Sequence, residues 1–197
     1  MGFFISANKN RKRQKIIFLV TAIFLAAGLV GSTLIGVFGG GSPGNVNAEY
    51  QPPKSAGEIV AGLEQQLEEN PGDVAIMGKL AEEYYRNGQV DKSLETYEKA
   101  LQTDPDNHEL RTSLAVTCFL EDKSDRAVAE IKQVIADNPD NQEAHYYLGL
   151  FLAYGQGEYQ QAQQELQKFI DMADPETMSG KIATAKEMIA EIEDMDN

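Results

Sequence analysis

The stretch MGKLAEEYYRNGQVDKSLETYEKALQTDP, residues 77–105, decides how the fold is interpreted. Apolar residues recur in it at intervals of three and four, which is the spacing of one face of an α-helix. Gly88 interrupts this pattern and Pro105 ends it, so the stretch predicts two helices joined by a short turn. Two such helices can be a lone hairpin or one unit of an array, and the flanking sequence distinguishes these cases.

The flanking sequence repeats the pattern. The interval from Pro71 to Pro105 is 34 residues, and the interval from Pro105 to Pro139 is also 34. A leucine followed directly by a small residue recurs with the prolines, at Leu80–Ala81, Leu114–Ala115 and Leu148–Gly149. The third unit runs to Pro175 with two extra residues, one of them in GQGEY between its helices. Residues 77–105 are therefore one unit of an array.

A helical pattern with a 34-residue period resembles the tetratricopeptide repeat family. The resemblance implies an all-α solenoid of helical hairpins, about three repeats with flanking helices, in which each hairpin covers its neighbour's apolar face. The expected elements are a leading helix at 58–70, repeats at 74–107, 108–141 and 142–175, and a capping helix at 176–195.

Some residues depart from the family pattern and others support it. Met77, Arg111 and His145 stand where the family often has Trp. Directly before the first helix of each unit stands an Asp or Asn, residue types that cap helix N-termini. These expected caps are Asp73, Asn107 and Asn141.

The N-terminal part of the chain predicts a membrane anchor. Residues 1–15 hold five Lys or Arg and no acid, and residues 16–38 carry no charge. Such an uncharged run is long enough to cross a bilayer of about 30 Å as a helix. The basic segment before it favours a cytoplasmic N-terminus and an extracytoplasmic repeat domain in the cell membrane. Residues 39–57, rich in Gly, Pro, Ser and Asn, predict a flexible linker.

Two alternatives concern this segment. VNA, residues 46–48, resembles a signal-peptidase site, so cleavage near Ala48 would release a secreted repeat protein. Small residues also recur at every fourth position of the apolar run and beyond it, a pattern that lets transmembrane helices approach closely but is also common in spans generally. This stripe consists of Gly28, Ser32, Gly36 and Gly40.

Composition excludes several classes of function. The net charge is −14, so the chain after the +5 N-terminal segment carries −14 − 5 = −19. Such a surface repels phosphate backbones, and no nucleic-acid partner is expected. Cys118 is the single cysteine and lies on an apolar helix face, as a core thiol.

No pattern of catalytic or metal-ligating residues appears. His108 and His145 do not have the spacing of metal ligands, and we interpret both as structural. No nucleophile motif or phosphate-binding loop is present. The sequence therefore predicts a non-enzymatic protein without a metal or cofactor.

In the tetratricopeptide family the first helix of each hairpin lines a concave surface that binds protein segments. The residues that the resemblance places on this groove are Glu82, Tyr85, Arg86, Thr112, Val116, Phe119, Leu120, Tyr146, Leu150 and Tyr154. Members that grip a C-terminal carboxylate use a Lys, Arg and Asn clamp there, and only Arg86 could contribute to one here. The groove therefore favours an apolar peptide or an amphipathic helix. The alternative is that the capping helix or a tighter superhelix buries these residues.

The expected function is a membrane-anchored scaffold that binds protein partners during assembly, maturation or quality control of envelope proteins. The layout of a basic segment, one span and acidic repeats resembles bacterial envelope proteins, including tetratricopeptide proteins of cytochrome c biogenesis. A structural homo-oligomer, built through the small-residue stripe and the groove, is the alternative.

Overall fold

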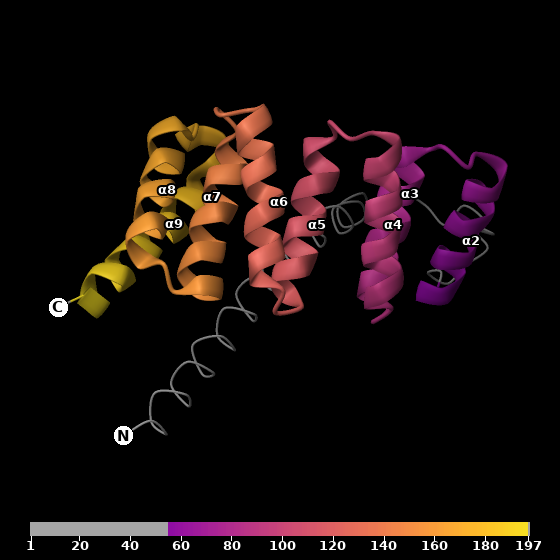
Figure 1. Ribbon diagram of the computed structural model, residues 1–197, viewed down its shortest axis with the longest axis horizontal. Helices are drawn as coiled ribbons and strands as arrows, with labels where there is room; N and C mark the ends of the chain where they lie inside the picture. Colours follow the sequence, from indigo (N-terminus) through magenta and orange to yellow (C-terminus); the bar gives the residue numbers. More distant parts are fainter. Residues whose placement is uncertain (1–54, 197) are drawn as a thin grey trace, which may run out of the picture. The chain divides into compact units, whose positions relative to one another are not determined.

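The computed structural model describes residues 55–196, and every regular element in this range is a helix (Figure 1). The predicted basic segment, transmembrane helix, small-residue stripe and most of the linker lie outside the described residues. Within 55–196, no helix is both long enough and apolar enough to cross a membrane. The predicted all-α array of helical hairpins is confirmed for this part of the chain.

Three hairpins follow one another. The first pairs α3 (Val74–Arg86) with α4 (Val90–Thr103), and the second pairs α5 (His108–Leu120) with α6 (Ser124–Asp137). The third pairs α7 (Gln142–Leu150) and a π-helical segment, η1 (Phe151–Gln156), with α8 (Tyr159–Met172). The flanking helices are α2 (Ala56–Glu69) and α9 (Pro175–Asp196).

The first helix of each hairpin begins at a side-chain cap, as predicted. The side chain of Asp73 accepts a hydrogen bond from Ile76 N at 3.0 Å. Asn107 and Asn141 cap α5 and α7 in the same way. Each cap satisfies one of the backbone N–H groups that a helix N-terminus leaves without an internal partner.

Helix α2 begins two residues earlier than predicted, within the expected linker. Ser55 is its N-cap, and Ser55 and Glu58 form a capping box in which each side chain accepts a hydrogen bond from the other residue's backbone N–H. The sequence SAGE at 55–58 carries the Ser-x-x-Glu signature of this motif. The linker was predicted to extend to residue 57 because of its Gly-rich composition. The capping box instead starts the helix at Ala56.

The core lies where the two helices of each hairpin cross. Ala81 and Ala115 are fully buried at this crossing, beside Leu80 and Leu114. In the third hairpin the small residue is Gly149, and a Cβ added there would lie 2.6 Å from Leu166 Cγ. Helices α7 and α8 therefore approach so closely that a residue larger than glycine would force neighbouring atoms to shift.

The extra residue of the third unit lies in η1. Its π-helical turn, Phe151–Gln156, continues α7 before Gly157 turns the chain toward α8. Because a π-helical turn holds one more residue than an α-helical turn, the helix absorbs the insertion and the hairpin remains aligned with its neighbours.

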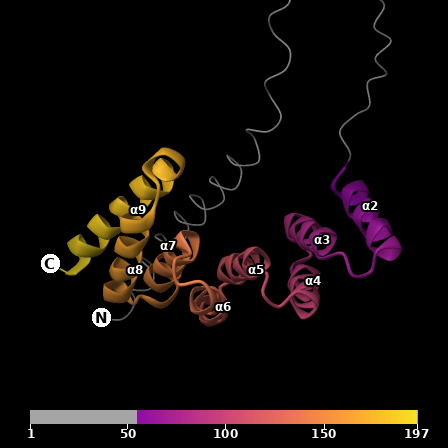
Figure 2. The same ribbon diagram turned by 90° about the horizontal axis from the view of Figure 1, so that it is seen from above.

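The helices form two rows. Figure 2 shows α3, α5 and α7 along one side of the array and α4, α6 and α8 along the other. At the two ends, α2 and α9 extend past the side formed by α3, α5 and α7 (Figure 2). We therefore call α3, α5 and α7 the inner row. The residues predicted to line the groove lie on the inner row, with Tyr154 in the η1 continuation of α7.

Candidate functional site

The candidate site is the surface of the inner row. Glu82 and Arg86 of α3 are well exposed, with 51% and 62% of their side-chain surfaces accessible. Five predicted groove residues are half-buried, namely Tyr85, Thr112, Phe119, Leu120 and Tyr154. The other three are buried, namely Val116, Tyr146 and Leu150. The surface is therefore open along α3 and α5 and closed along α7.

Tyr85 forms part of the boundary between α3 and α5. Burial, together with the charge and hydrogen bonding of the nearby Glu121 carboxylate, raises the pKa of its hydroxyl, which stays protonated at neutral pH. Next to it, the Arg86 guanidinium lies 2.6 Å from Glu83 and 3.8 Å from Glu82. Arg86 is thus neutralised by its own helix and cannot act as a free carboxylate-binding group.

Phe119 joins the second unit to the third. Its ring stacks on Phe151 of η1, with centroids 4.7 Å apart and planes 23° apart. A Cβ at Gly155 would lie 2.6 Å from Ser124 Oγ and 3.3 Å from the Phe119 ring. The π-helical segment therefore supports one face of Phe119, and the ring remains partly exposed.

The closed section over α7 differs from the predicted groove. Tyr146 is 3% exposed, and its ring lies 5.1 Å from the Phe169 ring and 5.8 Å from Lys181 Nζ of α9. Tyr154 donates a hydrogen bond to Glu191 of α9 at 3.3 Å. Tyr146 lies against α8 and α9, and Leu150 is 3% exposed, so the prediction that these two residues line an open groove is not met. The alternative in which the capping helix lies over groove residues describes Tyr146 and Tyr154.

The comparison with known families agrees with this geometry. Two overlapping matches to a tetratricopeptide repeat model cover residues 58–116 and 87–148, and a second tetratricopeptide repeat model matches residues 143–173. Together they span all three hairpins. The chain belongs to the tetratricopeptide repeat family. No curated protein matches its sequence.

Solved structures of tetratricopeptide proteins share the fold. MamA of AMB-1 is 27% identical, with a TM-score of 0.55, and the match covers 71% of this chain and 82% of that one. A MamA fragment from Desulfovibrio magneticus RS-1 is 18% identical, with a TM-score of 0.56, covering 72% of this chain and 86% of that one. The first tetratricopeptide domain of RPAP3 (Spaghetti), bound to an HSP90 peptide, is 18% identical, with a TM-score of 0.50, covering 59% of this chain and 93% of that one.

In the second and third units, the tetratricopeptide position that often holds Trp carries a side chain that makes polar contacts within the unit. Arg111 donates to Glu130 at 3.0 Å and to the carbonyl of Pro105 at 2.8 Å. One repeat later, His145 contacts Glu165 at 2.6 Å and the carbonyl of Pro139 at 2.9 Å. Both residues thus tie their first helix to the second helix and to the preceding turn.

These polar contacts were not predicted from the sequence. His145 was expected to be structural, but its carboxylate partner lies 20 positions away. The repeat spacing relates the two contacting pairs and could have indicated the second from the first. Thirty-four residues separate Arg111 from His145, and Glu130 and Glu165 are 35 apart because of the extra residue in the third unit.

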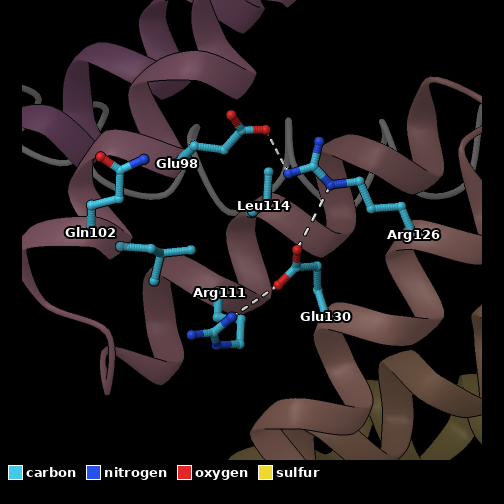
Figure 3. Close-up of a pocket in the computed structure, with 7 residues that line it drawn as sticks. Glu98, Gln102, Arg111, Leu114, Arg126 and Glu130 are labelled. Carbon is cyan, nitrogen blue, oxygen red and sulfur yellow. Dashed lines mark hydrogen bonds and ion pairs between the residues drawn. The ribbon is translucent and has the colours of Figure 1, made fainter.

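An open crevice of about 350 Å³ is lined by residues of α4, α5 and α6 around the contact between Arg111 and Glu130 (Figure 3). Arg126 lies 2.6 Å from Glu98 and 3.7 Å from Glu130, which also binds Arg111. The charges of two arginines and two glutamates cancel there. We interpret this crevice as a junction between the first and second units rather than as a ligand site.

The described residues 55–196 contain no group of three or more His, Cys, Asp or Glu side chains placed to hold a metal ion. Cys118 is fully buried, and burial raises the pKa of its thiol. A buried neutral thiol is a poor nucleophile. The array has the properties of a scaffold, and the tetratricopeptide family to which it belongs is typically non-catalytic.

Proposed function

We propose that the inner face along α3 and α5 docks a segment of a protein partner. The observation that carries this proposal is the row of half-buried apolar and aromatic side chains, Tyr85, Phe119 and Leu120, on the open part of the inner row. Rigid aromatic side chains supply contact area at low entropic cost. The RPAP3 domain, bound to an HSP90 peptide, shows a tetratricopeptide array of this kind in a peptide complex.

The membrane-anchored form of this scaffold is part of the proposal. It is supported by the uncharged run at 16–38 and the basic segment before it, which favour a span with the repeats outside the cytoplasm. A role in assembly or quality control of envelope proteins would follow from that location. Maturation of c-type cytochromes is one specific form of this role, and it rests on the resemblance of the layout alone.

Photo-crosslinking from the full-length chain in its native cells tests the docking. A photoreactive phenylalanine replaces Tyr85 on the inner face, and the control probe replaces Lys132, which is exposed on α6. We expect one dominant protein adduct from position 85 and none from position 132. The adduct should disappear when Leu120→Asp is added, because a charge there disrupts the apolar contact.

Two outcomes would contradict the proposal. Equal adducts from positions 85 and 132 would mean that contact is not specific to the inner face. Adducts formed only with a second copy of this chain would favour the homo-oligomer. The Leu120→Asp variant is compared with the unmodified chain by thermal unfolding, so that a folding defect is recognised.

A further inference from the structure

We infer that the partner segment docking along α3 and α5 is cationic, with Lys or Arg side chains placed among its apolar ones. This inference rests on the proposed docking function and specifies the chemistry of the partner. It is carried by the charges around the open face and by a contact that the chain makes with itself.

Carboxylates outnumber cations around the open face. Glu82 and Glu109 are exposed on α3 and α5, and Glu121 lies beside Tyr85 at the end of α5. The nearby cations are Lys79 and Arg86, and Arg86 is already paired with Glu83 at 2.6 Å. Four carboxylates, with Glu83 included, thus face two cations, and an approaching positive segment finds net attraction.

Neighbouring charges of both signs act on the pKa of Glu82. Burial raises the pKa of its carboxyl; Arg86 and Lys79 act to lower the pKa, and the charges of Glu83 and Glu109 raise it further. Burial is the largest cause of the upward shift in pKa, and Arg86 has the largest effect among the neighbouring charges. A partner cation near Glu82 would offset the like charges of Glu83 and Glu109.

The third unit already binds a cation in this manner. Lys181 of α9 lies 5.8 Å from the Tyr146 ring centroid and 5.7 Å from the Tyr147 ring centroid, and it pairs with Glu143. A lysine on a helix thus docks on a carboxylate and two aromatic faces of the inner row.

The repeat relates this contact to the open face. Glu109 stands 34 residues before Glu143 and occupies the same place in the second unit. It is exposed, and no ion pair involves it in the part of the chain that the structure describes. A partner helix with a cation could approach the Glu109 carboxylate as Lys181 approaches Glu143. The second unit has Thr112 and Ser113 in place of Tyr146 and Tyr147, so the correspondence extends to the carboxylate and not to the aromatic rings. An acidic segment, in contrast, would meet Glu82 and Glu109 with like charge.

The test uses three fluorescent helical peptides of about 20 residues that share one apolar face and carry Lys, Gln or Glu on the rest. Binding to the purified full-length chain is measured by fluorescence anisotropy at about 0.05 M and 0.5 M salt. We expect the Lys peptide to bind at least about tenfold more tightly than the Glu peptide, and we expect this difference to shrink at high salt.

Glu82→Gln should weaken binding of the Lys peptide by about threefold, the size expected for loss of one exposed ion pair. Glu95→Gln is the matched control, because it removes the same charge from an exposed site on α4, outside the inner row. The control should bind as the unmodified chain does. Both substitutions are at exposed positions, and thermal unfolding verifies that both variants fold.

The charge inference and the docking function can fail separately. Equal affinity for the three peptides, lost with Leu120→Asp, would overturn the cationic preference and leave docking intact. No binding of the Lys peptide, or equal weakening by Glu82→Gln and Glu95→Gln, would also overturn the inference. In that case the crosslink from position 85 decides independently whether the face docks any partner.

Discussion

At the scale of single residues, the turn between the two helices of each hairpin depends on a left-handed backbone. Gly88, Asp122 and Gly157 occupy this place in the three units, with φ values of 72°, 58° and 74°. Glycine adopts this conformation without steric cost, whereas a Cβ makes it unfavourable. The second unit uses Asp, one of the few non-glycine residues that tolerate it.

Gly88→Ala should therefore lower the free energy of unfolding by about 1 kcal/mol through backbone strain alone. No atom lies within 4 Å of the added Cβ, so no packing change contributes. Gly72→Ala is the control, since its Cβ also meets nothing and its φ is not positive. Urea denaturation measures both variants, and equal stability of the two would contradict the strain argument.

A second prediction concerns the tie between His145 and Glu165. Burial acts to raise the pKa of the Glu165 carboxyl, but hydrogen bonds from Lys168 and His145 outweigh it, so the pKa lies below its usual value. A carboxyl with a lowered folded-state pKa stabilises the fold above its unfolded pKa, and this contribution is lost as the pH falls through the folded pKa. Glu165→Ala also leaves the buried His145 Nδ1 without its partner.

Glu165→Ala should cost about 1–3 kcal/mol above about pH 5, and the difference from the unmodified chain should shrink at lower pH. Chemical denaturation across this pH range measures it. Glu95→Ala, at an exposed carboxylate of α4, should cost little at any pH. A penalty for Glu165→Ala that stayed constant down to the acid limit would show that the ionised carboxylate is not the stabilising form.

At the scale of helices, the separation within each hairpin is set by one small residue at the crossing. Two hairpins use Ala81 and Ala115, whereas α7 and α8 cross at Gly149. The added Cβ at Gly149 would also lie 3.1 Å from the carbonyl oxygen of Ala162. Because the backbone of α8 blocks the space, rotation of the Leu166 side chain alone cannot relieve the contact.

Gly149→Ala should therefore destabilise the array by about 1–2 kcal/mol, even though Ala is the better helix former by about 1 kcal/mol. Gly62→Ala in α2 is the matched control. Its added Cβ meets no atom within 4 Å, so this substitution should stabilise the fold rather than destabilise it. It should gain up to about 1 kcal/mol from helix propensity. Thermal or urea denaturation compares them, and a more stable Gly149→Ala variant would mean that the two helices can separate without cost.

At the scale of the whole array, each unit is stabilised by its neighbours in the sequence. Helix α9 packs on α8, and its Ala185, Met188 and Ile192 are buried. Its Lys181 and Glu191 also contact Tyr146 and Tyr154 of the inner row. No further helix follows it within the described residues. In a linear array such an end helix opens more readily than the central hairpins, because only one side of it is packed.

Ile192→Ser should lower the opening free energy of α9 by about 2 kcal/mol or more, since a 2% exposed side chain is lost from its contact with the array. Hydrogen exchange should show faster exchange in α9 and unchanged protection in α3 and α4. Glu187→Ser, at an exposed position of the same helix, is the control. Faster exchange spread equally over all hairpins would mean that the array unfolds as one unit.

The sequence by itself determined the features that repeat along the chain. The 34-residue period, the alternation of large and small residues at 80–81, 114–115 and 148–149, and the Asp or Asn caps are local patterns, so one unit can be aligned with the next. The all-α hairpin array follows from them. A local pattern was also present where the prediction erred, because the Ser55–Glu58 capping box extends α2 into the expected linker.

Only the tertiary structure decided which predicted groove residues remain accessible. Exposure depends on what lies across a helix, and α9 covers Tyr154 and Tyr146 from positions that the repeat pattern does not relate to them. The stacking of Phe119 on Phe151 and the contact between His145 and Glu165 likewise join separate helices. Periodicity places residues on a helix face, but packing between helices determines whether that face is open to a partner.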